Sequence, residues 1–132
     1  MRYLLDTSAV SDLVRNPQGK VAQRIRKVGE APVSTSIIVA AELRYGAATK
    51  GSARLSAQLE AVLSVLEVLP FEPPADANYA TMRAGLEETG TPMGAHDMLI
   101  AAHALALGST IVTDNEKEFA RVGGLARENW LR

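Results

Sequence analysis

The chain has 132 residues, of which 47% are hydrophobic and 5% aromatic, with a formal net charge of −1 and no cysteine. This length fits a single domain over residues 1–132 with an aliphatic, alanine-rich core. The composition excludes disulfides and thiolate metal sites, and no apolar run approaches the roughly 18 residues of a membrane helix, so we expect a soluble, cytoplasmic protein.

Strands and helices alternate along the first half of the chain. A short apolar strand over residues 2–5 precedes Asp6, which is placed to cap a helix from about 8 to 15 that Asn16-Pro17 ends. The sequence then predicts a helix over 20–28 and a short strand over 32–35. A long helix from 37 to about 49 follows, with Ser36 as its cap and Gly51 as its stop signal.

The same alternation continues in the second half. Leucine and valine side chains recur at helical spacing over 55–66. The elements expected after them are a strand over 67–70, a helix over 75–86, an alanine-rich helix over 96–107, a strand over 110–113, a short helix over 115–121 and a last strand within 125–131. This order predicts an α/β fold with a central parallel sheet of four to five strands and helices on both faces.

Acidic side chains fall near the carboxyl ends of these strands, where parallel sheets place their ligand sites. They are Asp6, Glu42, Asp97, Asp114 and Glu118. Each also has an ordinary interpretation. Asp6 can be a helix cap, Glu42 a solvated helix position and Asp97 an acid favoured by the helix dipole. Asp114 can be a turn residue and Glu118 part of a charged surface. Glu42 and Asp97 have apolar neighbours, which predicts largely buried helices, and a buried carboxylate needs a partner.

Several carboxylates gathered at one place repel one another unless a cation joins them. Mg²⁺, or Mn²⁺ in its place, prefers carboxylate and water ligands and suits phosphoryl chemistry. Setting four such carboxylates aside leaves a net charge of +3 on the rest of the chain, so the overall charge does not exclude a nucleic-acid substrate. We expect His96 and His103 to be structural, because their spacing does not match a zinc helix motif.

Other signatures of phosphate chemistry are absent. The sequence has no glycine-rich phosphate loop ending in Gly-Lys-Ser/Thr. Asp6 is followed by Thr7-Ser8, without the second acid two residues later that a haloacid-dehalogenase-type phosphatase requires and without the paired acids of a receiver domain.

Five segments in order resemble the VapC-type PIN-domain toxins of type II toxin–antitoxin pairs. They are residues 4–8 (LLDTS), 41–46 (AELRYG), 94–104 (GAHDMLIAAHA), 113–119 (TDNEKEF) and 124–130 (GLARENW). The resemblance implies a PIN-like fold, Mg²⁺-dependent endoribonuclease activity, a homodimer and a cognate small antitoxin.

The resemblance also implies roles for individual residues. Asp6, Glu42 and Asp97 match the family's acids by position, with Asp6 and Asp97 on a first Mg²⁺ and Glu42 beside them. Asp114 and Glu118 remain alternatives for the fourth acid. The supporting polar residues are Asn115, as a neutral ligand or water anchor, and the hydroxyls of Thr7, Ser8 and Thr113.

Two alternatives to this function stay open: a DNA-directed or structure-specific PIN nuclease, and a non-catalytic binding module with structural acids. Lys20, Arg24 and Lys27 form a basic stripe that is either a solvated face or an RNA contact. Helix 55–66 and the apolar side chains of Ile37, Ile38, Val39 and Tyr45 either fill the core or pair with a second copy. An antitoxin is expected to insert a basic side chain, such as arginine, among Asp6, Glu42 and Asp97.

Overall fold

A wholly parallel, five-stranded sheet of order β3-β2-β1-β4-β5 organises the chain. The computed structural model describes residues 1–132. In chain order its elements are β1 (Tyr3–Leu5), α1 (Thr7–Arg15), α2 (Lys20–Val28), β2 (Val33–Ser36), α3 (Ile37–Lys50), α4 (Ala53–Val65), β3 (Glu67–Leu69), α5 (Ala75–Glu88), α6 (Ala95–Leu107), β4 (Thr110–Val112), α7 (Glu116–Phe119) and β5 (Arg127–Glu128).

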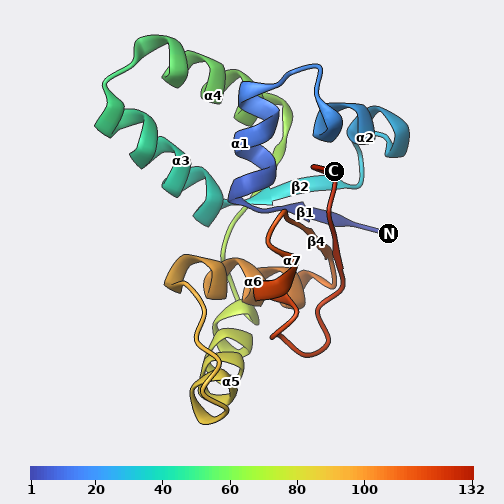
Figure 1. Ribbon diagram of the computed structural model, residues 1–132, viewed down its shortest axis with the longest axis vertical. Coiled ribbons are helices and arrows are strands. Elements are labelled where there is room, and N and C mark those ends of the chain that lie inside the picture. Colours follow the sequence, from blue (N-terminus) through green and yellow to red (C-terminus); the bar gives the residue numbers. More distant parts are fainter.

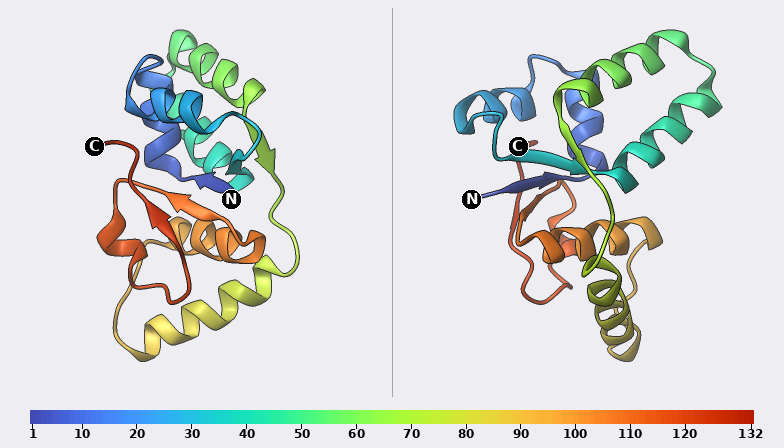
Figure 2. Two further views of the ribbon diagram at one scale, coloured as in Figure 1. Left: turned by 90° about the vertical axis from the view of Figure 1, so that its right-hand side faces the viewer. Right: turned by 180° about the vertical axis from the view of Figure 1, so that it is seen from behind.

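Helices cover both faces of this sheet, as the sequence predicts. Figure 1 shows α1 to α4 on one side of the strands and α5 to α7 on the other, and Figure 2 shows the same division from two further directions. Leu4 and Leu5 of β1 and Ile111 and Val112 of β4 point to opposite faces within each strand and are fully buried. The predicted fold class is therefore confirmed.

The predicted cap and stop signal of α3 are also confirmed, and α6 ends in the same way as α3. The Ser36 hydroxyl accepts a hydrogen bond from the Ile38 N–H at 3.0 Å and so caps α3. Gly51 and Gly108 end α3 and α6 with φ angles of 63° and 66°, a left-handed conformation that glycine adopts without steric cost.

The C-terminal segment has less regular structure than predicted. The expected helix over 115–121 is only the four-residue α7, and the expected last strand is the two-residue β5. Side-chain packing holds this tail instead, because Trp130 is 2% exposed and its ring lies 4.9 Å from that of Tyr3. The apolar residues within 125–131 predicted a strand, but apolar residues are also buried where a tail without regular structure packs against the core.

The prediction that α3 is largely buried is wrong. Val39, Ala40 and Ala47 face the core, whereas Ala41 is exposed and Tyr45 is 72% exposed. On α4, Leu59 and Leu63 also belong to the core, while Val65, the last residue of this helix, is 72% exposed. The apolar side chains of α3 and α4 that could either fill the core or pair with a second copy are thus divided between the core and the surface. The homodimer stays a prediction, with the exposed side chains as the part that a second copy would cover.

No helix combines the length and the apolar character needed to cross a membrane.

Candidate active site

Asp6 directly follows β1 and is buried at the carboxyl edge of the sheet, 3% exposed. Its Oδ1 accepts hydrogen bonds from the Ser8 hydroxyl at 2.6 Å and the Ala9 N–H at 2.9 Å, so it caps α1. Burial nevertheless raises its pKa, against the lowering effect of hydrogen bonds from Ser8, Thr113 and Ala9. The carboxylate is therefore both a cap and a poorly compensated charge.

Asp97 lies in the first turn of α6, whose N-cap, Gly94, offers no side chain. Burial first, and then a hydrogen bond with Glu118 and the negative charges of Glu118, Asp6 and Glu42, raise the pKa of Asp97 to about 7. Asp97 and Glu118 thus interact directly, and the negative charge of Glu118 disfavours ionisation of Asp97. Like-charge repulsion of this kind is typical of a site that binds a cation or performs acid–base chemistry.

The structure brings Glu118 rather than Asp114 next to Asp97. The Gly94 N–H donates to Glu118 Oε1 at 3.2 Å, and the Asn115 amide donates to Glu118 Oε2 at 2.9 Å. A Cβ on Gly94 would lie 3.6 Å from Asp97 Oδ2 and 3.7 Å from Glu118 Oε1, so the Gly94 backbone borders both carboxylates. Sequence reasoning missed this contribution of Gly94, whose only signal was a small residue just before an acid-bearing helix.

Asp114 is exposed and reaches the site less directly. Its backbone N–H donates to the Ser8 hydroxyl at 3.2 Å, which in turn holds Asp6. The charge of Asp114 is the weakest of the causes that perturb the pKa of Asp6. Its position therefore indicates an indirect role.

Glu42 reaches the same site from α3. Its Oε1 is buried without a hydrogen-bond partner and lies 3.5 Å from Nδ1 of His96. Burial raises the pKa of Glu42, His96 lowers it and Asp6 raises it again. The side chain of His96 is 65% exposed and faces this acid, so it is not part of the core, and its structural role stays a prediction.

The predicted hydroxyl side chains surround these acids. Thr113 is fully buried, and its Oγ1 accepts the Asn115 N–H at 2.9 Å. Thr7 Oγ1 is buried without a hydrogen-bond partner. Together with Ser8, these residues connect the end of β1 to the segment after β4.

The chemistry of this set fits a hydrated divalent cation. Asp6, Glu42 and Asp97 all have raised pKa values, and Glu42 Oε1 and Thr7 Oγ1 lack partners. No three Asp, Glu or His side chains converge on one point closely enough to form a closed cage. Mg²⁺ does not require such a cage, because it keeps several waters and binds proteins through one or two carboxylates.

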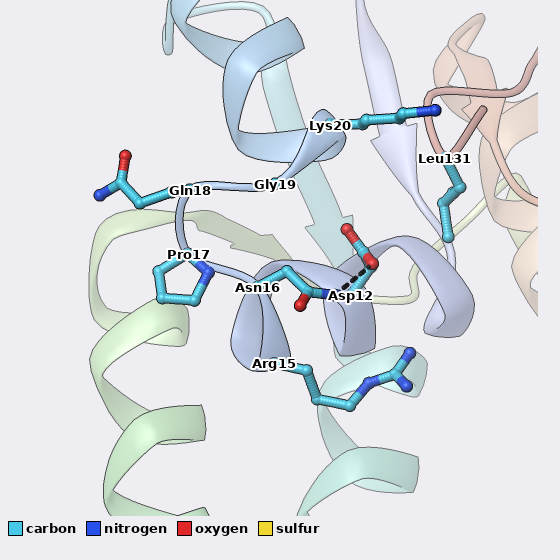
Figure 3. Close-up of a pocket in the computed structure, with 8 residues that line it drawn as sticks. All are labelled: Asp12, Arg15, Asn16, Pro17, Gln18, Gly19, Lys20 and Leu131. Carbon is cyan, nitrogen blue, oxygen red and sulfur yellow. Dashed lines mark hydrogen bonds between the residues drawn. The ribbon is translucent and has the colours of Figure 1, made fainter.

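The basic stripe lies apart from the acids. Figure 1 places α2 beside the start of β1, whereas the acids follow the strand ends. Arg24 pairs with Glu128 at 3.4 Å and lies over the Trp130 ring, 5.6 Å from its centroid. Figure 3 shows the adjoining hollow of about 520 Å³, lined by Lys20, Arg15 and six further residues, none of them a candidate site acid.

A second hollow, of about 160 Å³, adjoins the acidic site between α1, α3 and α4. Glu42 is one of its lining residues. The others include apolar Val14, Leu43, Ala47, Leu55 and Leu59 and basic Arg15 and Lys50. This hollow is therefore a small apolar groove that also has the charged side chains of Glu42, Arg15 and Lys50 in its lining.

Comparison with known proteins finds relatives that match nearly the whole length of the chain. A family model described as "PIN domain" matches residues 3–125. The chain is 36% identical to Ribonuclease VapC2 of Rickettsia felis over 132 residues, covering 98% of each protein. It is 34% identical to the tRNA(fMet)-specific endonuclease VapC of Shigella flexneri, again covering 98% of each.

A solved structure shows the same fold. The chain superimposes with a TM-score of 0.91 and 32% identity on a chain of the VapBC2 complex from Rickettsia felis bound to a DNA fragment from their promoter. The match covers 98% of this chain and 99% of that one.

Proposed function

The chain belongs to the VapC ribonucleases of the PIN-domain family, and we propose that it is a Mg²⁺-dependent endoribonuclease that hydrolyses RNA phosphodiesters as the toxin of a toxin–antitoxin pair. The observation that carries this proposal is the convergence of acids from four elements at one sheet edge. Its clearest sign is Asp97, whose pKa is raised to about 7 by burial, Glu118, Asp6 and Glu42. Such a cluster favours a hard cation, with Mn²⁺ as a substitute for Mg²⁺.

In this proposal Asp6 and Asp97 would hold the ion, with Glu42 beside them. A bound ion would supply Lewis-acid polarisation of the phosphate and would lower the pKa of a water. Glu118, fixed by the Gly94 N–H and Asn115, takes up the proton of the attacking water. Ser8 holds the Asp6 carboxylate in one orientation through its 2.6 Å hydrogen bond.

The chemical ends of the products test this function. Because water rather than the ribose 2′-hydroxyl attacks, cleavage of a labelled RNA is expected to give a 5′-phosphate and a 3′-hydroxyl. A 2′,3′-cyclic phosphate would contradict the proposal. Equal cleavage of a DNA of the same sequence would favour the DNA-directed alternative, and the absence of cleavage of any RNA in Mg²⁺ or Mn²⁺ would favour the binding module.

The basic stripe is proposed as a contact for RNA phosphates. Lys20 and Lys27 are exposed on α2 and have no acidic partner, unlike Arg24. We expect Lys20→Gln with Lys27→Gln to weaken RNA binding at low salt and to flatten the dependence of log K on log salt by about 1 to 2 units, since each lost phosphate contact removes about 0.7 to 0.9. Binding measured from 50 to 200 mM salt checks this. Arg54→Gln with Arg83→Gln, which removes two charges away from α2 and from the groove beside the acids, provides the charge-matched control, and an unchanged slope in the α2 variant favours a merely solvated face.

A cognate small antitoxin is the proposed partner, because solved relatives are VapBC complexes. The apolar groove between α1, α3 and α4 includes Glu42, so a segment bound there lies next to the acidic site. An arginine from that segment would satisfy the carboxylates of Asp6, Glu42 and Asp97 through its fork of donors.

Antitoxin and Mg²⁺ are therefore expected to compete for one set of carboxylates. Antitoxin affinity should fall as Mg²⁺ is raised, while the affinity of an antitoxin in which that arginine is replaced by alanine should respond less. Calorimetric titrations at fixed ionic strength, with Mg²⁺ exchanged for Na⁺, measure this. An affinity independent of Mg²⁺ would indicate blockade away from the metal site.

A further inference from the structure

His103 is a buried titratable group for which the proposed chemistry has no use. It lies on α6, six residues after Asp97, and is 1% exposed. Its Nδ1 lies 2.8 Å from the Ser36 hydroxyl, and its ring packs edge-on against Phe71 with centroids 5.4 Å apart. Burial lowers the pKa of His103, so the ring is neutral at pH 7.

The Ser36 hydroxyl can donate to this ring while it caps α3. Ser36 Oγ accepts the N–H of Ile38 at 3.0 Å, which leaves its own proton free to be donated. Donation to Nδ1 of His103 makes Nδ1 the acceptor and places the ring proton on Nε2. Nε2 has no partner of ordinary hydrogen-bond geometry, although the Pro70 backbone and the charge of Glu72 lie near enough to oppose the lowering of the pKa, so the bond to Ser36 is the one well-formed side-chain hydrogen bond of the ring.

Ser36 is also the residue from which α3 starts. It is the last residue of β2, fully buried, and the N-cap of α3. Glu42 follows Ser36 by six residues on α3, and Asp97 precedes His103 by six residues on α6. At 1.5 Å per residue, each acid therefore lies about 9 Å along its helix from the Ser36–His103 bond.

The two helices connect this bond to the two acids. In Figure 1, α3 rises from the end of β2 while α6 runs along the opposite face of the sheet. At the far end of the pair, Glu42 Oε1 lies 3.5 Å from Nδ1 of His96, next to Asp97. A small change at the Ser36–His103 contact would therefore change the separation of Glu42 from Asp97.

We propose that His103 is a positioning residue that sets the spacing of Glu42 and Asp97 through its hydrogen bond to the N-cap Ser36, and thereby sets the affinity of the site for a divalent cation. The inference rests on the proposed metal-dependent function. Residues that hydrogen-bond a metal ligand directly change metal affinity by about ten- to a hundredfold when replaced, and for His103, which acts on two acids through their helices, we expect an effect at the lower end of that range.

The test measures Mn²⁺ binding to the metal-free, full-length protein by calorimetry, independently of cleavage. His103→Leu removes the acceptor for Ser36 and is expected to weaken Mn²⁺ binding by about tenfold or more. His103→Asn returns a polar acceptor on a short side chain and should recover part of this loss. Val21→Ala, a fully buried change on α2, is the control for lost core packing and should leave Mn²⁺ affinity unchanged.

Substitution of Ser36, which shares the hydrogen bond with His103, gives the second part of the test. Ser36→Ala should weaken Mn²⁺ binding as well, and adding His103→Leu to it should cause little further loss, because both changes break one contact. Mn²⁺ affinity within twofold of the unmodified protein in His103→Leu, or in Ser36→Ala should the former fail to fold, would overturn the proposal. Additive losses in the double variant would also overturn it.

One more variant separates this proposal from the function on which it rests. Asp97→Asn should abolish most Mn²⁺ binding if the acids form the metal site. Unchanged binding in Asp97→Asn would refute the metal site itself. Lost binding in Asp97→Asn with full binding in His103→Leu would refute only the positioning role.

Discussion

Asp97→Asn is expected to lower the rate of RNA cleavage by about 10³-fold, since the cation it helps to hold contributes several kcal/mol and each 1.4 kcal/mol is a factor of ten. The substitution keeps the shape and the position at the start of α6 but removes the charge that the neighbouring acids perturb most. Asp6→Asn should have a similar effect, although it can also weaken the cap of α1. Single-turnover cleavage with excess enzyme measures the rate.

Glu118 and Asp114 form a matched pair for the same experiment. Glu118 contacts Asp97, the Gly94 N–H and Asn115, so Glu118→Gln should cost about a hundredfold, within the usual range for a group that moves a proton. Asp114 is exposed and acts through Ser8, so Asp114→Asn should cost less than about tenfold. The reverse order would assign the fourth acid to Asp114. Full activity of Asp97→Asn, or of the unmodified protein in EDTA, would refute metal-dependent catalysis by these residues.

The sequence was sufficient to predict the parallel sheet and the location of the acids, because both follow from local patterns. Fully buried parallel strands appear as short apolar runs, and Leu4-Leu5 and Ile111-Val112 are such runs. An acid directly after such a strand lies at the carboxyl edge of the sheet whatever the order of the strands. Asp6 could therefore be placed without knowing that β1 lies between β2 and β4.

What the sequence could not supply depends on contacts between distant segments. Asp114 and Glu118 follow the end of β4 by two and six residues, which favours Asp114, whereas the contacts of Glu118 with Asp97 and with the Gly94 backbone, 24 residues before it, favour Glu118. The exposure of Tyr45 was missed because the sequence of an apolar helix does not show whether the protein covers one of its sides or both. The contact of His103 with Ser36 spans 67 residues and has no local signal.

The metal-free protein is expected to lose stability as the pH rises from about 4 to about 7. The pKa of Asp97 is 3.8 in an unfolded chain and about 7 in the folded protein, so the folded state binds more protons throughout that interval. The free energy of unfolding therefore falls with rising pH there and levels off above it. Asp6 and Glu42 act in the same direction, because their pKa values are also raised by burial.

The size of this loss is on the order of 1 to 2 kcal/mol for Asp97, which is well below the full value of its pKa shift because the side chain is only partly buried and solvent screens it. Urea unfolding in EDTA at pH 5 and pH 8 measures it, and Asp97→Asn is the matched variant, since it cannot ionise. The variant should be less sensitive to pH and more stable than the unmodified protein at pH 8, although it is the less active of the two.

Mg²⁺ should reverse the order at pH 8, because an ion that binds only the folded state stabilises it by an amount that grows with the logarithm of one plus its concentration over Kd. The unmodified protein should then gain stability with added Mg²⁺, while Asp97→Asn should gain little. Equal pH sensitivity in the two proteins, together with an equal response to Mg²⁺, would show that these carboxylates are structural and that the repulsion among them is not relieved by a cation.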